Sequence, residues 1–159
     1  PDMVAISFAS NVNQIVIVKR ILSKIWPKEN IKIICKIESR LGLKNIDDLI
    51  TNADGIMVAR GDLLQCIDPY MLPQIQFSIV RKCRDKMKYV CVATEFFERF
   101  AESGIVNRSE LSDVALAARE GADTIMLARE TGNSEYNFEG VKLINKILEL
   151  EYENIKINK

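Results

Sequence analysis

Two hydrophobic patterns alternate along this chain. Apolar runs of strand length recur at residues 3–8, 31–38, 55–60, 89–94 and 123–128. After each run, apolar residues return every three or four positions, which is the spacing of an amphipathic helix. Strand and helix thus alternate five times without a linker rich in proline, glycine or serine. This order predicts an α/β fold with one parallel sheet and right-handed crossovers.

The helices are bounded by recognisable capping signals. The first is expected to end before Pro27, the second lies near 45–52, and the last covers 138–150. Candidate caps are Ser10 or Asn11 before the first helix, Asp68 with Pro69 before the third, and Gly121 after the fourth. Five such units fit either an open doubly wound sheet or part of a barrel, since a complete (β/α)₈ barrel needs about 250 residues.

The run at 31–38 brings an ammonium and a carboxylate to one place. Alternation puts Lys32, Ile34, Lys36 and Glu38 on one face of the strand and four apolar residues on the other. The run at 55–60 repeats the arrangement, with Ile56, Val58, Arg60 and Asp62 on one face. A solvent-facing strand with merely soluble charges is the ordinary alternative. Two strands that end alike favour a site at a common rim, where α/β proteins bind ligands.

Composition excludes several classes of function. Lysine plus arginine equals aspartate plus glutamate, 22 of each, so net charge indicates neither a nucleic acid nor an anionic membrane as partner. The chain has no histidine, and its four cysteines show no C-x-x-C spacing, which indicates reduced core thiols rather than a zinc site. No apolar run could span a bilayer and no signal pattern is present. A start at Pro1 without methionine suggests a piece of a longer chain.

With these residues identified, the chain resembles the catalytic barrel of pyruvate kinase from its fourth strand to its eighth. The matching segments are DMVAISF, IKIICKIES, DGIMVARGDL, YVCVATE and DTIMLARET, with NRSELSDVALAAREGAD similar to the helix between the last two strands. The resemblance implies a partial TIM (β/α)₈ barrel of five βα units over residues 1–152, followed by a polar tail at 153–159. By the same resemblance, we expect the first three strands, the lid and the C-terminal regulatory domain to be absent from this chain.

The resemblance also implies roles for the charged residues. Glu38 and Asp62 match the two carboxylates that hold Mg²⁺ or Mn²⁺, and hard oxygen ligands suit these ions. Lys36 matches the lysine that stabilises the phosphoryl group in flight, where fixed positive charge is what the chemistry needs. The parent enzyme would transfer a phosphoryl group from phosphoenolpyruvate to ADP, giving pyruvate and ATP, in cytoplasmic glycolysis. It would be a homo-oligomer that needs K⁺, whose ligands lie outside this chain.

Two further matches concern the substrate. Ala59, Arg60, Gly61 and Asp62 match the loop whose backbone amides hold the substrate carboxylate. Thr94 matches the threonine near the carbon where the enolate is protonated, and it is assigned to both catalysis and substrate binding. The ordinary interpretations are a strand-end threonine for Thr94 and a structural ion pair with Asp62 or Glu38 for Arg60. Arg108 and Glu110, in the family's subunit-contact helix, could be only capping and surface charges.

Four departures from the family pattern bear on activity. They are Leu64 in place of the glycine after Arg-Gly-Asp-Leu, Glu95 in place of glutamine, Ala128–Arg129 in place of Ser-Gly, and Ser10 in place of arginine. With two unpaired sheet edges at 3–8 and 123–128, we expect this chain to need the rest of the barrel or another subunit and to be inactive alone. The alternatives are a non-catalytic structural or interaction protein derived from the enzyme, and a metal-dependent aldolase or lyase of the phosphoenolpyruvate/pyruvate barrel group.

Overall fold

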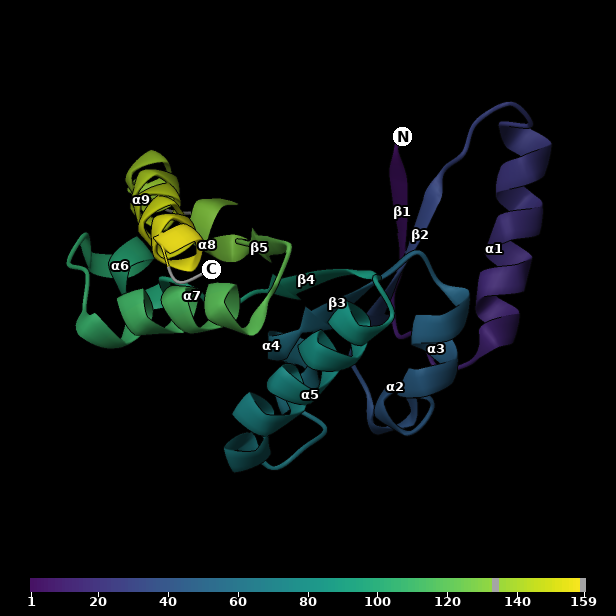
Figure 1. The fold of residues 1–159 in the computed structure, drawn as a ribbon, viewed down its shortest axis with the longest axis horizontal. Helices are drawn as coiled ribbons and strands as arrows, with labels where there is room; N and C mark the ends of the chain where they lie inside the picture. Colours follow the sequence, from purple (N-terminus) through teal and green to yellow (C-terminus); the bar gives the residue numbers. More distant parts are fainter. Residues whose placement is uncertain (133–134, 158–159) are drawn as a thin grey trace. The chain divides into compact units, whose positions relative to one another are not determined.

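Five strands alternate with helices along the described part of the chain (Figure 1). The computed structural model describes residues 1–132 and 135–157, with residues 129–130 and 154–157 described by their backbone alone. The strands are β1 (Met3–Ile6), β2 (Lys32–Ile37), β3 (Gly55–Ala59), β4 (Tyr89–Ala93) and β5 (Thr124–Met126). Each lies within a predicted run and is somewhat shorter than it, so the α/β prediction is confirmed.

The helices begin and end largely where the capping signals indicate. Asn11 and Gln14 form a capping box at the start of the first helix, and Gly121 ends another at a φ of 103°. The helix expected near 45–52 is confirmed at Ile46–Asn52, a separate short helix at Arg40–Lys44 precedes it, and the last helix extends beyond its expected end at residue 150. The helices are α1 (Val12–Ile25), α2 (Arg40–Lys44), α3 (Ile46–Asn52), α4 (Arg60–Leu64), the 3₁₀ helix η1 (Pro69–Met71), α5 (Leu72–Asp85), α6 (Glu98–Ser103), α7 (Arg108–Glu120), α8 (Arg129–Gly132) and α9 (Asn137–Ile157).

The order of the strands decides between the two sheet types that the sequence left open. Hydrogen-bonded neighbours follow the chain order β1-β2-β3-β4-β5. A doubly wound sheet would reverse its order at a switch point, whereas a barrel does not. The parallel register pairs Ile6 with Cys35 and Ile37 with Val58. The C-terminal ends of β1, β2 and β3 therefore lie side by side, and β1 and β5 stand at the two ends of the order.

The chain divides into two compact units, Pro1–Val92 and Ala93–Lys159. In the first unit, α1 packs beside α3 and α3 beside α5 (Figure 1). Strands β2 and β3 are buried on both faces, since Ile34 on the face that carries Lys36 is only 4% exposed. The solvent-facing interpretation of β2 is therefore wrong. The core of this unit includes Ile33, Cys35, Ile37, Ile50, Ile56, Val58, Leu63, Val80 and Val90.

In the second unit, α7 packs along α9. Arg119 on α7 forms a bidentate ion pair with Glu151 on α9, at 2.6 and 2.7 Å. Phe100 on α6 contacts the rings of Phe97 and Tyr136. Among the described residues, no helix combines the length and apolarity needed to cross a membrane.

Candidate functional site at the strand ends

Lys36 and Glu38 meet at the end of β2, as the strand period predicted. The Lys36 Nζ atom lies 2.7 Å from Glu38 Oε1. The lysine side chain is 25% exposed, whereas that of the glutamate is only 1% exposed. Oε1 faces the ammonium without hydrogen-bond geometry, and it has no hydrogen-bond partner in the described part of the chain. A buried carboxylate is therefore neutralised by a cation that still reaches solvent.

The loop after β1 supports this pair, which the sequence did not indicate. The Phe8 amide donates to Glu38 Oε2 at 2.5 Å, Lys36 Nζ donates to Ser7 Oγ at 3.5 Å, and the Ala9 amide donates to the Lys36 carbonyl at 3.2 Å. Phe8 adopts a φ of 49°, which is uncommon for a residue with a Cβ atom. Three consecutive residues of this loop thus contact Lys36 and Glu38.

The Arg-Gly-Asp segment is helical, which corrects the strand-face prediction. Strand β3 ends at Ala59, and α4 begins at Arg60, so alternation no longer governs Arg60 and Asp62. Arg60 is 4% exposed, whereas Asp62 is exposed. Leu64 also lies in α4 and its φ is not positive, so this position does not require the glycine that the family usually has there.

Thr94 lies in the second unit, directly after β4. Its φ is 70°, and its amide donates to the Met126 carbonyl of β5 at 2.9 Å. Glu95 also has a positive φ, of 58°. The other predicted site residues, from Lys36 to Asp62, belong to the first unit. The side chain of Arg129, the bulky cation noted in the sequence, lies outside the described residues.

Glu38 and Asp62 are the residues predicted to hold a divalent cation. Oε1 of Glu38 has acceptor capacity that no hydrogen bond uses, and the Asp62 carboxylate makes no hydrogen bond or ion pair with the described residues. Such hard oxygens fit Mg²⁺ or Mn²⁺. Within the described ranges, no group of three or more His, Cys, Asp and Glu residues could enclose a metal.

A family model described as the barrel domain of pyruvate kinase matches residues 1–141. The chain belongs to the pyruvate kinase family. The family and the barrel fold that the sequence predicted are therefore confirmed, whereas the roles of Lys36, Glu38, Ala59 to Asp62 and Thr94 stay predictions.

Individual pyruvate kinases give the extent of the similarity. The enzyme of Clostridium acetobutylicum is 39% identical over 153 residues, covering 96% of this chain and 32% of that protein. The pyruvate kinase of Staphylococcus epidermidis is 36% identical over 146 residues, which cover 92% of this chain and 25% of that protein. A crystal structure of Cryptosporidium parvum pyruvate kinase matches with a TM-score of 0.89 at 33% identity. The match covers 95% of this chain and 32% of the chain in that structure. The chain thus spans a third or less of these pyruvate kinases.

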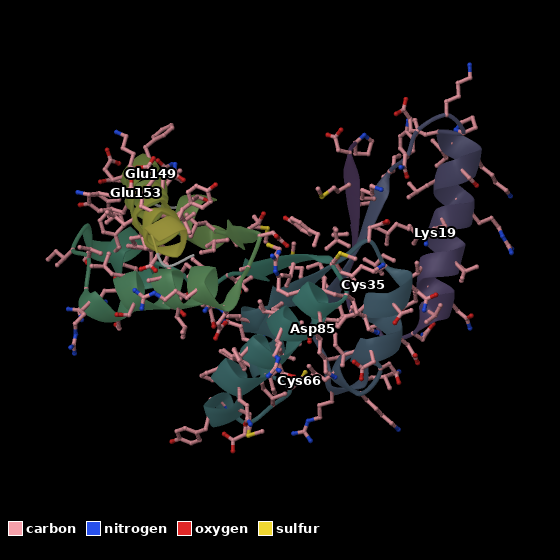
Figure 2. The ribbon with its side chains drawn as sticks, viewed as in Figure 1. Lys19, Cys35, Cys66, Asp85, Glu149 and Glu153 are labelled. Atoms are coloured by element: carbon pink, nitrogen blue, oxygen red, sulfur yellow. The ribbon has the colours of Figure 1, made fainter. Side chains whose placement is uncertain are left out.

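The cysteines of this pyruvate kinase barrel segment are largely structural. Cys35, Cys83 and Cys91 are buried and free, as the sequence predicted. Burial raises the pKa of the Cys35 and Cys91 thiols to about 11, with the charge of Lys19 opposing the shift at Cys35. These thiols stay protonated and unreactive near neutral pH. Cys66 is only half-buried, and Figure 2 labels it together with Cys35 and Lys19.

Proposed function

We propose that this chain supplies the fourth to eighth strands of a pyruvate kinase barrel, and with them the groups that handle the metal and the phosphoryl group. The reaction of the complete protein would transfer a phosphoryl group from phosphoenolpyruvate to ADP. The observation that supports this most directly is the Lys36–Glu38 pair, with an ammonium 2.7 Å from a buried carboxylate at the end of β2. The choice of reaction rests on the membership of this chain in the pyruvate kinase family.

In this proposal, Lys36 stabilises the negative charge of the phosphoryl group during transfer. Its ammonium is held between Glu38 and Ser7, so little reorientation is needed when charge develops. A bound Mg²⁺ or Mn²⁺ would polarise the phosphoryl and enolate oxygens. Glu38 and Asp62 would hold this cation, and the hydrogen bond from the Phe8 amide would keep the Glu38 carboxylate in place.

The remaining assignments concern substrate and surroundings. Arg60, Gly61 and the adjoining backbone from Ala59 to Asp62 would bind the substrate carboxylate, and the Thr94 hydroxyl would orient a water that protonates the enolate. The complete protein would also need K⁺ and the other barrel strands, and it would assemble as a homo-oligomer. Its location would be the cytoplasm, although a relative from Ricinus communis is a chloroplastic isozyme.

The test is pyruvate formation from phosphoenolpyruvate and ADP, with Mg²⁺ and K⁺, by the longest native polypeptide that contains this segment. Lys36→Met should lower kcat by about 10²- to 10³-fold, since it removes a charge aimed at the transition state. Lys32→Met is the matched control, because Lys32 lies on the same strand but is exposed and 3.9 Å from Asp54. It should leave kcat unchanged.

Two other outcomes would contradict the proposal. Equal turnover by the native and Lys36→Met polypeptides would remove the lysine from the reaction. No turnover by a folded native polypeptide, with no Mn²⁺ bound, would favour the non-catalytic alternative. Glu95 next to Thr94 is the departure that most favours this alternative, because it replaces a neutral glutamine of the family pattern with a negative charge. Glu95→Gln should then fail to restore activity.

A further inference from the structure

The segments that follow β2 and β3 are joined by two hydrogen bonds that run in opposite directions. The Cys66 thiol donates to the backbone carbonyl of Glu38, with the sulfur 3.6 Å from the oxygen. In return, Arg40 Nε donates to the backbone carbonyl of Cys66. Cys66 is thereby held on both sides, by the residue that carries the buried carboxylate and by a residue in the first turn of α2. We call Arg40 and Cys66 the clamp.

The clamp acts where the sheet no longer determines the geometry. The register of β2 and β3 ends at the pair Ile37 and Val58, so Glu38 and Asp62 both lie beyond the last paired residues. Asp62 is carried by α4, a helix of five residues, and helices this short are not stable through their own hydrogen bonds. Cys66 lies two residues after the end of α4, and its amide donates to the Leu63 carbonyl at 2.9 Å. Fixing Cys66 therefore fixes the C-terminal end of α4.

We propose that Arg40 and Cys66 are positioning residues for the candidate metal site, because they hold α4, and with it Asp62, against the segment that carries Glu38. This inference rests on the proposed function, since the two carboxylates need a fixed separation only if they share a cation. Neither clamp residue is among the proposed ligands of the cation or the proposed substrate-binding residues. Groups that orient metal ligands commonly change metal affinity by about 10-fold or more when they are removed.

The first experiment measures Mn²⁺ affinity, by electron paramagnetic resonance of the free ion, in the longest native polypeptide that contains this segment. Arg40→Ala and Cys66→Ala should each raise the Kd of Mn²⁺ by about 10-fold. Cys66→Ser should restore most of the affinity, because a hydroxyl can donate to the same Glu38 carbonyl. Arg20→Ala, which removes an exposed arginine from α1, is the control and should not change the Kd. Cys66→Ser behaving like Cys66→Ala, or an unchanged Kd in Arg40→Ala, would overturn the inference.

The second experiment tests the clamp without reference to the metal or to activity. Cys66 is half-buried, whereas Cys35, Cys83 and Cys91 are at most 2% exposed, so a thiol reagent should label Cys66 first. Its labelling rate, followed by mass spectrometry of the peptide that contains it, should rise several-fold in Arg40→Ala and stay at the native value in Arg20→Ala. An unchanged rate in Arg40→Ala would overturn the clamp itself.

The two experiments separate the possible failures. A native polypeptide that binds no Mn²⁺ overturns the proposed function and the metal role of the clamp together. Faster labelling of Cys66 in Arg40→Ala would then still establish the contact between α2 and the segment after α4. Native Mn²⁺ binding with an unaltered Kd in the clamp variants overturns this inference alone.

Discussion

Replacing Lys36 with methionine leaves the Glu38 carboxylate buried without its cation. At 2.7 Å the two charges attract by about 6 kcal/mol if the effective dielectric constant is about 20. The cost of burying Glu38 offsets part of this attraction. Removing one partner of a buried pair costs about 3–5 kcal/mol. The Lys36 side chain is 25% exposed. We therefore expect Lys36→Met to lower the unfolding free energy by about 3 kcal/mol, near the lower limit of this range.

A double-mutant cycle isolates the interaction from the loss of side-chain packing. Glu38→Gln retains an oxygen that accepts from the Phe8 amide, and it leaves Lys36 able to turn toward solvent. It should therefore lower the unfolding free energy by less than Lys36→Met does. The double variant no longer buries a charge, so its loss of unfolding free energy should be smaller than the sum of the losses in the two single variants. We expect a coupling energy of about 2 kcal/mol, within the range for contacting residues.

The assay is urea unfolding at neutral pH, followed by circular dichroism. Lys32→Met serves as the control, because the Lys32–Asp54 pair is wider, at 3.9 Å, with side chains 47% and 37% exposed. Exposed pairs of this kind contribute less than about 1 kcal/mol. Additive effects within about 0.5 kcal/mol, or a loss in Lys36→Met no larger than in Lys32→Met, would refute the argument from burial.

Three further predictions concern stability. Gly104→Ala should lower the unfolding free energy by about 2 kcal/mol in urea titrations. The reason is that φ at Gly104 is +68° and that an added Cβ atom would lie 2.7 Å from the Tyr136 ring. An unchanged unfolding free energy would contradict this packing. Gly55→Ala should cost at least about 2 kcal/mol in the same assay, since its Cβ would meet a backbone carbonyl of β4 at 2.7 Å, and no loss would contradict that packing. Hydrogen bonds from Arg119 lower the pKa of Glu151 from its usual 4.5, so this carboxylate stabilises the fold above about pH 4.5 and the contribution is lost as pH falls through the lowered value. Glu151→Gln should therefore flatten the acid side of a thermal-melting profile, and an unchanged profile would exclude the linkage.

The strands and helices were predictable because local chemistry sets them. Apolar runs gave all five strands, and the caps at Asn11 and Gly121 lie where helix ends require them. The adjacency of Lys36 and Glu38 was also predictable, since it follows from a period of two along one strand. These features depend on neighbours within a few residues, so no knowledge of the remaining chain was needed.

The strand-face argument failed for Arg60 and Asp62 because it assumed that β3 continued. The chain turns into α4 at Arg60, and nothing in the alternation of apolar residues marks that change. The short helix α2 was likewise missed, although the helix expected near 45–52 is present as α3. Each error lies at the end of an element, where contacts with other segments decide the backbone conformation.

The sequence by itself determined the five βα units, the placement of an ammonium beside a carboxylate, and the pyruvate kinase family. Only the tertiary structure decided the strand order, the burial of Glu38 and the contacts made to it by Phe8 and Cys66. The physical reason is distance along the chain: Phe8 and Cys66 lie about thirty residues on either side of Glu38. Contacts across such separations form only when the strands pair in register, and the periodicity of a single segment carries no record of that pairing.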